Sequence, residues 1–292
     1  MQSQGGYPSK GRVGIKGQEI KIHPTAIIHP DAEIGDDVEI GAYSIIGENV
    51  KIGSNVKIHP HVVIDGWTTI GKGCSIYQFA SIGAPPQDLK FGGEKSEVVI
   101  GENNTIREFV TINRATLHGG GKTIIGNNNF LMAYVHVAHD CKIGSHIVLA
   151  NAATLAGHIE VFDHVIIGGL VAVHQFARIG SYSIVGGASA VTHDIPPYVM
   201  AVGNRAKLYG LNKIGLRRHG FSREEITNLK KAYDIIFRNG MGLKDALEKV
   251  GKEIKDSAHI KNLIEFIKNS KRGITRAKPT SREEGADEVE ED

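Results

Sequence analysis

Aromatic residues, cysteines and long apolar runs are all scarce in this chain of 292 residues. Phe, Trp and Tyr make up 6% of the residues, which argues against a core built around large rings. The two cysteines, Cys74 and Cys141, are too few for a disulfide framework and indicate a reducing cytoplasm. No apolar run is long enough to span a bilayer, so the chain is not expected to cross a membrane. Residues 1–18 are expected to be a disordered leader, because they lack the apolar stretch of a signal peptide.

The net charge of +2 hides an acidic C-terminal end. Residues 281–292 contain seven acidic residues and one basic residue, Arg282. The rest of the chain holds 33 Lys and Arg against 25 Asp and Glu, a net charge of +8. A moderately basic body favours an acidic partner or an anionic substrate, although a solubilising tail on an ordinary surface produces the same balance. The tail, residues 274–292, is expected to be disordered.

What the chain does have is a six-residue repeat. An aliphatic residue, isoleucine at all eleven positions of the first run, recurs every six residues in three runs: Ile22 to Ile82, Ile100 to Ile112 and Ile125 to Val191. The residue four positions after this aliphatic residue is usually small or β-branched. The residue directly after the aliphatic residue is often glycine. An amphipathic helix would instead place apolar residues every three to four positions.

This repeat predicts a β-solenoid, a parallel β-helix in which each unit is one short strand and one turn. The first and fifth residues of each unit would point inward. Three units would close a coil of 18 residues, and successive coils would stack ~4.8 Å apart. The glycine after each repeat residue is expected to relieve the corner by adopting a positive φ.

Two insertions and a change of periodicity divide the chain. The β-helix is predicted over residues 19–200, with inserted loops at about 84–98 and 114–123. A helical domain is predicted over residues 201–273. Ser222 and Glu225 have the spacing of a capping box, Gly240 would end the helix that follows, and two further helices are expected near 243–250 and 258–270.

Histidines gather in the second half of the repeat. His139, Gly157 and Gln175 are spaced by 18 residues, so they would stack in one outward-facing column, with His158 and His174 beside it. Histidine titrates near neutral pH and can act as a general base, and the adjacent Asp140 could orient it. The N–H of Gly157 is a candidate oxyanion donor for acyl transfer.

Two other interpretations of the histidines stay open. The histidines could simply be exposed, or His136, His139 and His158 could bind zinc, as in some β-helix carbonic anhydrases.

The basic cluster Arg217-Arg218-His219 could hold a diphosphate or be a solvated patch. Nucleic-acid binding is not expected, because no aromatic residues interleave with the basic ones. Cys74 and Cys141 fall on inward positions, which favours packing over reactivity.

Several segments together resemble the UDP-N-acetylglucosamine O-acyltransferases, the enzymes that begin lipid A synthesis. They are residues 76–83, Gln87-Asp88-Leu89-Lys90, residues 136–141, 151–158, 172–176 and 218–224. The resemblance implies a left-handed coil, against the usual right-handed preference, and a homotrimer with active sites between subunits. It also implies transfer of a 3-hydroxyacyl group from acyl carrier protein to the 3-hydroxyl of UDP-N-acetylglucosamine, with no metal and no cofactor.

The resemblance also implies a role for each matching residue. It makes His139 the base, Asp140 its orienting partner and Gly157 the oxyanion donor. It also implies that the substrate is contacted by His136, His158, His174 and Gln175. The residues implied to contact the sugar and the acyl chain are Gln87, Asp88 and Lys90. Asn212, Arg218 and His219 would contact the UDP group, and Gly187 would leave room for a long acyl chain.

Two positions depart from the family pattern. His219 stands where a second arginine is common, which would make diphosphate binding partly pH-dependent. Ile214 stands where an acidic residue is common, which leaves the uracil contact open. A later N-acyltransferase of the same pathway is an alternative, although it usually has an additional N-terminal domain. The acyl length and the choice between a hydroxyl and an amine acceptor are not determined by the sequence.

Overall fold

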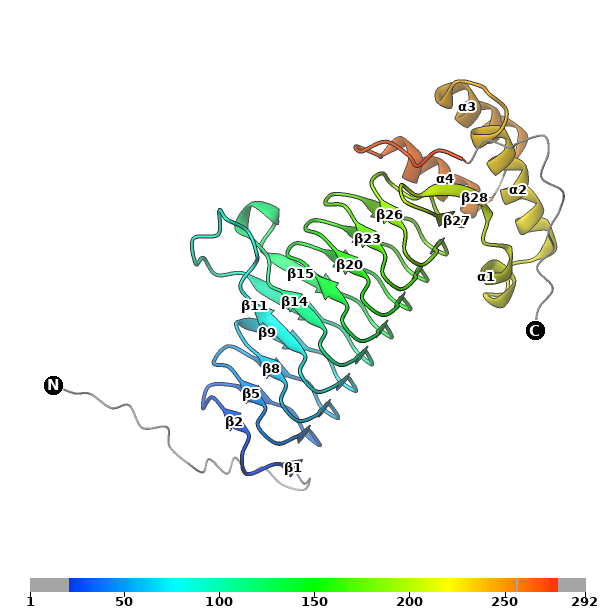
Figure 1. The fold of residues 1–292 in the computed structure, drawn as a ribbon. Helices are drawn as coiled ribbons and strands as arrows, with labels where there is room; N and C mark the ends of the chain where they lie inside the picture. Colours follow the sequence, from blue (N-terminus) through cyan, green and yellow to red (C-terminus); the bar gives the residue numbers. More distant parts are fainter. Residues whose placement is uncertain (1–20, 256, 278–292) are drawn as a thin grey trace.

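Most of the chain winds into a single parallel β-helix that ends in a group of helices (Figure 1). The structure is a computed structural model, and it describes residues 21–255 and 257–277. Strands one coil apart pair in parallel with a register of 18 residues, as Phe130 with Val148 and His136 with Thr154. The predicted leader and residues 278–292 of the predicted tail lie outside the described residues. The first part of that tail was wrongly predicted to be disordered, since Ile274 forms a β-bridge with Asp194 and Ala277 forms one with Leu208.

The strands form three sheets, which we number in the order in which the chain enters them. Sheet 1 contains β1 (Lys21–Ile22), β4 (Glu39–Ile40), β7 (Lys57–Ile58), β10 (Ser75–Ile76), β13 (Thr105–Ile106), β16 (Phe130–Leu131), β19 (Val148–Leu149), β22 (Ile166–Ile167), β25 (Ile184–Val185), β27 (Val199–Val202) and β28 (Lys207–Leu211). Sheet 2 contains β2 (Ile27–Ile28), β5 (Ile45–Ile46), β8 (Val63–Ile64), β11 (Ser81–Ala84), β14 (Thr111–Asn113), β17 (His136–Val137), β20 (Thr154–Leu155), β23 (Ala172–Val173) and β26 (Ala190–Val191). Sheet 3 contains β3 (Glu33–Ile34), β6 (Lys51–Ile52), β9 (Trp67–Ile70), β12 (Glu97–Ile100), β15 (Lys122–Ile125), β18 (Lys142–Ile143), β21 (Glu160–Val161) and β24 (Arg178–Ile179). Each corner of the coil is named below by the two sheets that it joins.

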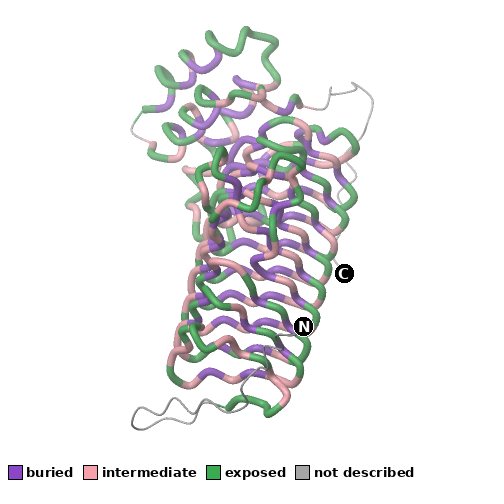
Figure 2. The backbone as a smooth tube through the Cα atoms, turned by 90° about the vertical axis from the view of Figure 1, so that its left-hand side faces the viewer, coloured by how far each residue is buried: buried purple, intermediate pink, exposed green. Residues whose placement is uncertain are grey.

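The repeat residues fill the inside of the coil, as Figure 2 shows by the regular return of buried segments along the tube. Ile64, Ile76 and Ile82 have no exposed surface, and the small residues four positions later, such as Cys74 and Val62, are equally buried. Burying one isoleucine side chain stabilises the fold by roughly 2–3 kcal/mol. Each stacked coil adds a similar contribution, so the core is stable without large aromatic side chains.

The glycine that follows the repeat residue differs from the prediction. Gly71 does not adopt a positive φ; the left-handed residue lies two positions later in the turn, as at Gly73, His61 and Phe79. Gly71 is required for another reason, because a Cβ there would lie 2.5 Å from the carbonyl carbon of Gly101 in the next coil. At Gly71 and the similar corners the glycine therefore permits close stacking rather than an unusual backbone conformation, whereas Gly83, before the first inserted loop, does adopt the predicted positive φ, at 87°.

We expect Gly71→Ala to lower the free energy of unfolding by about 1–3 kcal/mol, because the new methyl group must push two coils apart. Urea denaturation of Gly71→Ala and of Gly92→Ala measures this. Gly92 is the matched control, since a Cβ there meets nothing nearer than Glu94 Oε2 at 3.5 Å. Equal midpoints for the two variants would show that the corner tolerates a side chain.

Both inserted loops leave the coil at corner 2–3. The first, residues 85–96, joins β11 to β12, and the second, residues 114–121, joins β14 to β15 and contains the short 3₁₀ helix η1 (Leu117–Gly119). The side-chain amide of Asn113 donates to the carbonyl of Pro85 at 2.9 Å, and the Arg114 guanidinium lies 5.4 Å from the Phe91 ring. The start of the second loop is therefore tied to the first, and both rise from the same side of the coil (Figure 1).

Beyond the coil, β27 and β28 form an antiparallel pair that the sequence did not predict. Four helices follow: α1 (Lys213–Arg218), α2 (Arg223–Phe237), α3 (Leu243–Glu253) and α4 (Ala258–Lys268). The capping box is confirmed, since Ser222 Oγ accepts from the Glu225 N–H and Glu225 Oε2 accepts from the Ser222 N–H. None of the helices in the described residues is long and apolar enough to cross a membrane.

Candidate active site

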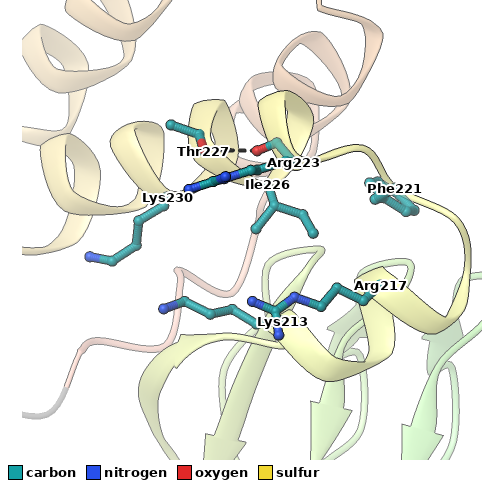
Figure 3. Close-up of a pocket in the computed structure, with 7 residues that line it drawn as sticks. All are labelled: Lys213, Arg217, Phe221, Arg223, Ile226, Thr227 and Lys230. Atoms are coloured by element: carbon teal, nitrogen blue, oxygen red, sulfur yellow. Dashed lines mark hydrogen bonds between the residues drawn. The ribbon is translucent and has the colours of Figure 1, made fainter.

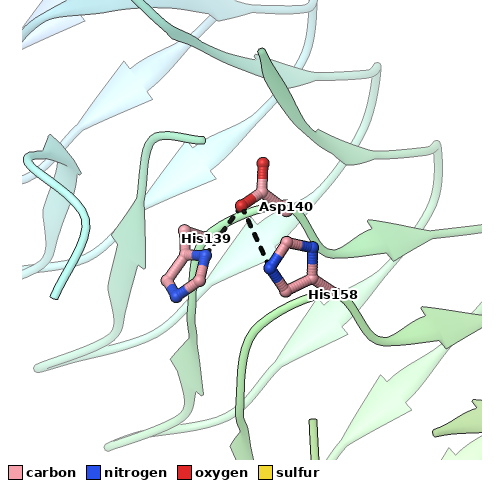
Figure 4. Close-up of side chains that lie close together, drawn as sticks. All are labelled: His139, Asp140 and His158. Atoms are coloured by element: carbon pink, nitrogen blue, oxygen red, sulfur yellow. Dashed lines mark hydrogen bonds and ion pairs between the residues drawn. The ribbon is translucent and has the colours of Figure 1, made fainter. Parts of the chain in front are cut away.

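His139 and Asp140 occupy corner 2–3 of the coil, just after β17, with Asp140 in the left-handed region at φ 61°. The Nδ1 of His139 lies 2.7 Å from Asp140 Oδ2, and Figure 4 shows the imidazole facing the carboxylate. The His139 side chain is 13% exposed and that of Asp140 is fully covered. A buried carboxylate that accepts from Nδ1 leaves Nε2 as the nitrogen that can take a proton.

The predicted column is present. The His139 carbonyl accepts from the His158 N–H at 3.0 Å, and the Gly157 carbonyl accepts from the Phe176 N–H at 3.2 Å, so residues 18 apart lie over one another. Gly157 lies directly against the His139 ring, since a Cβ there would be 2.5 Å from Cε1. Within the described part of the chain, the Gly157 N–H makes no hydrogen bond. It is therefore available to a ligand beside the base.

His158 completes the cluster at this corner. Its Nε2 lies 3.7 Å from Asp140 Oδ2, and its ring stacks on Phe176 with centroids 4.5 Å apart. It meets the His139 ring edge-on at 5.2 Å. Burial lowers the pKa of His158, although the Asp140 carboxylate opposes that shift. Its ring nitrogen Nε2 is thus directed at the same carboxylate as the His139 ring.

The other predicted histidines are less closely joined to this cluster. His136 lies on β17, and its Nδ1 is 2.7 Å from Thr111 Oγ1; burial, and secondarily the charge of His139, lower its pKa. His174 and Gln175 are exposed one coil above Gly157, at the same corner. Neither residue contacts the His139–Asp140 pair through a hydrogen bond or ion pair among the described residues.

The first inserted loop brings Asp88 to the site. Asp88 Oδ2 lies 3.4 Å from Nε2 of His118, and a hydrogen bond from the Lys90 N–H holds the pKa of the Asp88 carboxyl below its usual range. Gln87 and Lys90 are exposed on the same loop. His118 was not among the predicted site residues, yet its ring lies 6.0 Å from that of His158. Its place beside the glycines of the second insertion was the signal that could have identified it.

The predicted UDP contacts lie elsewhere. Asn212 caps α1, with Oδ1 accepting from the Gly215 N–H and Nδ2 donating to the Tyr182 carbonyl. The His219 ring lies 4.8 Å from that of His164, which is on corner 3–1, and Arg218 precedes it on α1. Gly187 is exposed on corner 1–2. A single chain therefore distributes the predicted residues over three corners and does not bring these groups to His139.

A basic cavity of about 480 Å³ separates α1 from α2 (Figure 3). Four cationic side chains, Lys213, Arg217, Arg223 and Lys230, line it together with Phe221, Ile226 and Thr227. It lies on the helical domain, away from the histidine cluster. Its charge suits an anionic group.

The histidine cluster also has some features of a metal site. The donor atoms of His139, Asp140 and His158 lie within 4.8 Å of one another. However, two ligands of one zinc ion lie about 3.3 Å apart, given bonds of ~2.0 Å, whereas Nδ1 and Oδ2 are at a hydrogen-bond distance of 2.7 Å. The arrangement therefore fits a carboxylate–imidazole pair better than a metal centre, and His136 is occupied with Thr111.

Both cysteines are buried, as predicted. Burial raises the pKa of the Cys141 thiol to about 12, and its Sγ donates to the Ala156 carbonyl at 3.1 Å. Burial also raises the pKa of Cys74. Neither thiol can supply a thiolate nucleophile near neutral pH, so both pack the core.

Comparisons with known proteins agree with this architecture. Residues 19–53, 49–84 and 122–157 match the bacterial transferase hexapeptide family, and residues 194–275 match the second domain of UDP-N-acetylglucosamine O-acyltransferase. The acyl-[acyl-carrier-protein]–UDP-N-acetylglucosamine O-acyltransferase of Thermodesulfovibrio yellowstonii is 58% identical over 74% of this chain and 84% of its own length. That of Nautilia profundicola is 54% identical over 70% of this chain and 79% of its own. The crystal structure of the Bacteroides fragilis enzyme superposes with a TM-score of 0.85 at 48% identity, covering 87% of this chain and 99% of that one.

The six-residue repeat, the histidine–aspartate pair at corner 2–3 and the similarity to these proteins together define a class of enzyme. This class is the hexapeptide-repeat acyltransferases. The two relatives that are 54–58% identical narrow this class to one family. The chain belongs to the UDP-N-acetylglucosamine O-acyltransferase family. The predicted left-handed parallel β-helix with a small helical C-terminal domain is thereby confirmed.

Proposed function

We propose that this enzyme transfers a 3-hydroxyacyl group from acyl carrier protein to the 3-hydroxyl of UDP-N-acetylglucosamine, the first step of lipid A biosynthesis. The observation that carries the proposal is the His139–Asp140 pair with the unbonded N–H of Gly157 against its ring. The two buried, unpaired cysteines suit a cytoplasmic enzyme.

In the proposed reaction, Nε2 of His139 takes the proton of the sugar 3-hydroxyl as its oxygen attacks the thioester carbonyl. The negative charge that forms on the carbonyl oxygen is stabilised by the Gly157 N–H. When the tetrahedral intermediate collapses, the carbon–sulfur bond breaks and the leaving thiolate takes the proton from His139. Asp140 stabilises the imidazolium between the two transfers.

The remaining predicted residues bind rather than react. His136, His158, His174 and Gln175 line the approach to the base, and Gln87, Asp88 and Lys90 reach it from the first loop. Asn212, Arg218 and His219 would contact UDP from a neighbouring copy, since within one chain they lie on a different corner from His139. This distribution supports a homotrimer with sites between subunits. Leu89, fully exposed at the tip of the first loop, suits a contact with a second copy.

The acyl donors are tested with carrier-protein thioesters of several lengths and UDP-N-acetylglucosamine. Gly187 is exposed on corner 1–2, and a Cβ there would lie 3.3 Å from the Gly169 carbonyl oxygen. We expect the enzyme to prefer long chains, and Gly187→Met to lower kcat/KM for them by about 100-fold while sparing short ones, because about four heavy atoms then occupy the proposed site for the end of the acyl chain. Equal losses at all lengths would remove Gly187 from the acyl site.

Two further measurements in this assay test which acceptor group reacts and how the carrier protein binds. Replacing the acceptor with its 3-amino analogue tests the choice of nucleophile. Raising the ionic strength should increase the KM for the acidic carrier protein, given the basic body of the chain. No transfer to either acceptor, together with stoichiometric zinc by elemental analysis, would contradict the proposed function.

A further inference from the structure

The second inserted loop lies directly on the buried face of Asp140. Asp140 Oδ1 accepts from the Thr116 N–H at 3.0 Å, and Oδ2 accepts from the Thr116 hydroxyl at 2.7 Å. The same Oδ2 accepts from His139 Nδ1 at 2.7 Å. One residue of the loop therefore holds both oxygens of the carboxylate that orients the base.

Thr116 is itself held in place. It is the N-terminal cap of η1, its hydroxyl oxygen accepts from the Gly119 N–H at 3.2 Å, and its side chain is fully buried. Because the hydroxyl oxygen receives the Gly119 hydrogen, its own hydrogen is directed at Asp140. The carboxylate thus meets two donors whose directions are set by the loop.

Gly119 lets the loop come this close. A Cβ at Gly119 would lie 2.0 Å from the Asp140 carboxyl carbon, so only glycine permits the contact, and its φ is not in the left-handed region. On the other side, the Asp140 N–H donates to Thr123 Oγ1 at 2.8 Å, where β15 begins after the loop. The loop therefore covers the carboxylate, and the strand that follows the loop anchors the Asp140 backbone.

We propose that Thr116 is a positioning residue for the acyl-transfer base: through Asp140 it sets the orientation of the His139 ring. The second loop then has a function beyond connecting two strands. Thr116 touches neither substrate, and its contribution passes entirely through the carboxylate. The inference rests on the proposed role of His139 as base.

The consequence for catalysis follows from the hydrogen bonds. A carboxylate that has lost its Thr116 hydroxyl partner is free to rotate away from Nδ1, so kcat falls while the binding contacts remain.

The test compares Thr116→Val, which keeps the shape and removes the hydroxyl, with Thr116→Ser, which keeps the hydroxyl. We expect Thr116→Val to lower kcat about 30-fold with little change in KM. That factor corresponds to the loss of one hydrogen bond to a carboxylate, ~2 kcal/mol at 1.36 kcal/mol per factor of ten. Thr116→Ser should restore most of the activity. Thr69→Val, an exposed threonine on β9, controls for the loss of a hydroxyl from the coil.

A spectroscopic measurement makes the test independent of turnover. In protein labelled with ¹⁵N-histidine, the His139 Nδ1 proton should resonate at low field because of its 2.7 Å bond to Asp140. The signal should persist in Thr116→Ser and be lost or shifted in Thr116→Val. If Thr116→Val does not fold, Gly119→Ala, which displaces the loop from Asp140, should produce the same loss.

Wild-type turnover and an unchanged low-field proton in Thr116→Val would overturn the inference. If wild-type protein transfers no acyl group, or His139→Ala remains active, the proposed function fails instead. The two failures are therefore distinguishable in one set of proteins.

Discussion

His139→Ala should lose about a thousandfold in kcat while the coil stays folded. A general base typically contributes 10²–10⁴-fold, and His139 is the imidazole that the Asp140 carboxylate holds with Nε2 available. KM for UDP-N-acetylglucosamine should change little, because the sugar and nucleotide contacts are assigned to other residues. Steady-state kinetics with a long-chain carrier-protein donor measure both constants.

His29→Ala is the matched control, since His29 lies at the same corner 2–3 but on the N-terminal coil, several coils away from His139, and is partly exposed. It should keep wild-type kinetics. Circular dichroism and size-exclusion chromatography of both variants exclude unfolding or dissociation as the cause. Activity of His139→Ala near that of the control would remove His139 as the base.

Gly157→Ala should lower kcat by roughly 100-fold, the second large effect expected here. The new methyl carbon would lie 2.5 Å from Cε1 and 2.8 Å from Nε2 of His139, so the ring must retreat by about 1 Å to reach ordinary contact. A misplacement of ~1 Å at a reacting group is enough for a loss of this size. The methyl group also crowds the N–H proposed to stabilise the oxyanion.

The control is Gly251→Ala on α3, where the added Cβ meets only Ile264 Cδ1 at an ordinary 3.8 Å. This variant should remain fully active. A crystal structure of Gly157→Ala shows whether the ring has moved. Full activity of Gly157→Ala would mean that the base does not lie against this glycine during turnover.

Much of the fold could be predicted because a six-residue period is a local property of the chain. An inward position in one unit is inward in every unit, so Ile22 to Ile82 define the coil without knowledge of any distant contact. The same period placed Gly157 over His139, since the register between coils is 18 residues. The function of most corner glycines, such as Gly71, was mistaken, because the contact that requires them is with the next coil, whereas Gly83 does have the predicted positive φ.

The loops could not be predicted in the same way. Their sequence shows only that the repeat stops, and where Thr116 and His118 lie depends on how each loop folds back on the coil. The hairpin of β27 and β28 and the short helix α1 were missed for a related reason, since two strands and six residues of helix carry too little periodicity to detect.

The sequence by itself determined the coil, its core, and the alignment of His139, Gly157 and Gln175 at one corner, because all of these follow from a fixed repeat. Only the tertiary structure decided that Asp140 is buried beneath the second loop, that Thr116 holds both of its oxygens, and that Asn212 and His219 lie on a different corner from the base. The physical reason is that hydrogen bonds between non-repeating segments depend on directions in space, which a one-dimensional period does not contain.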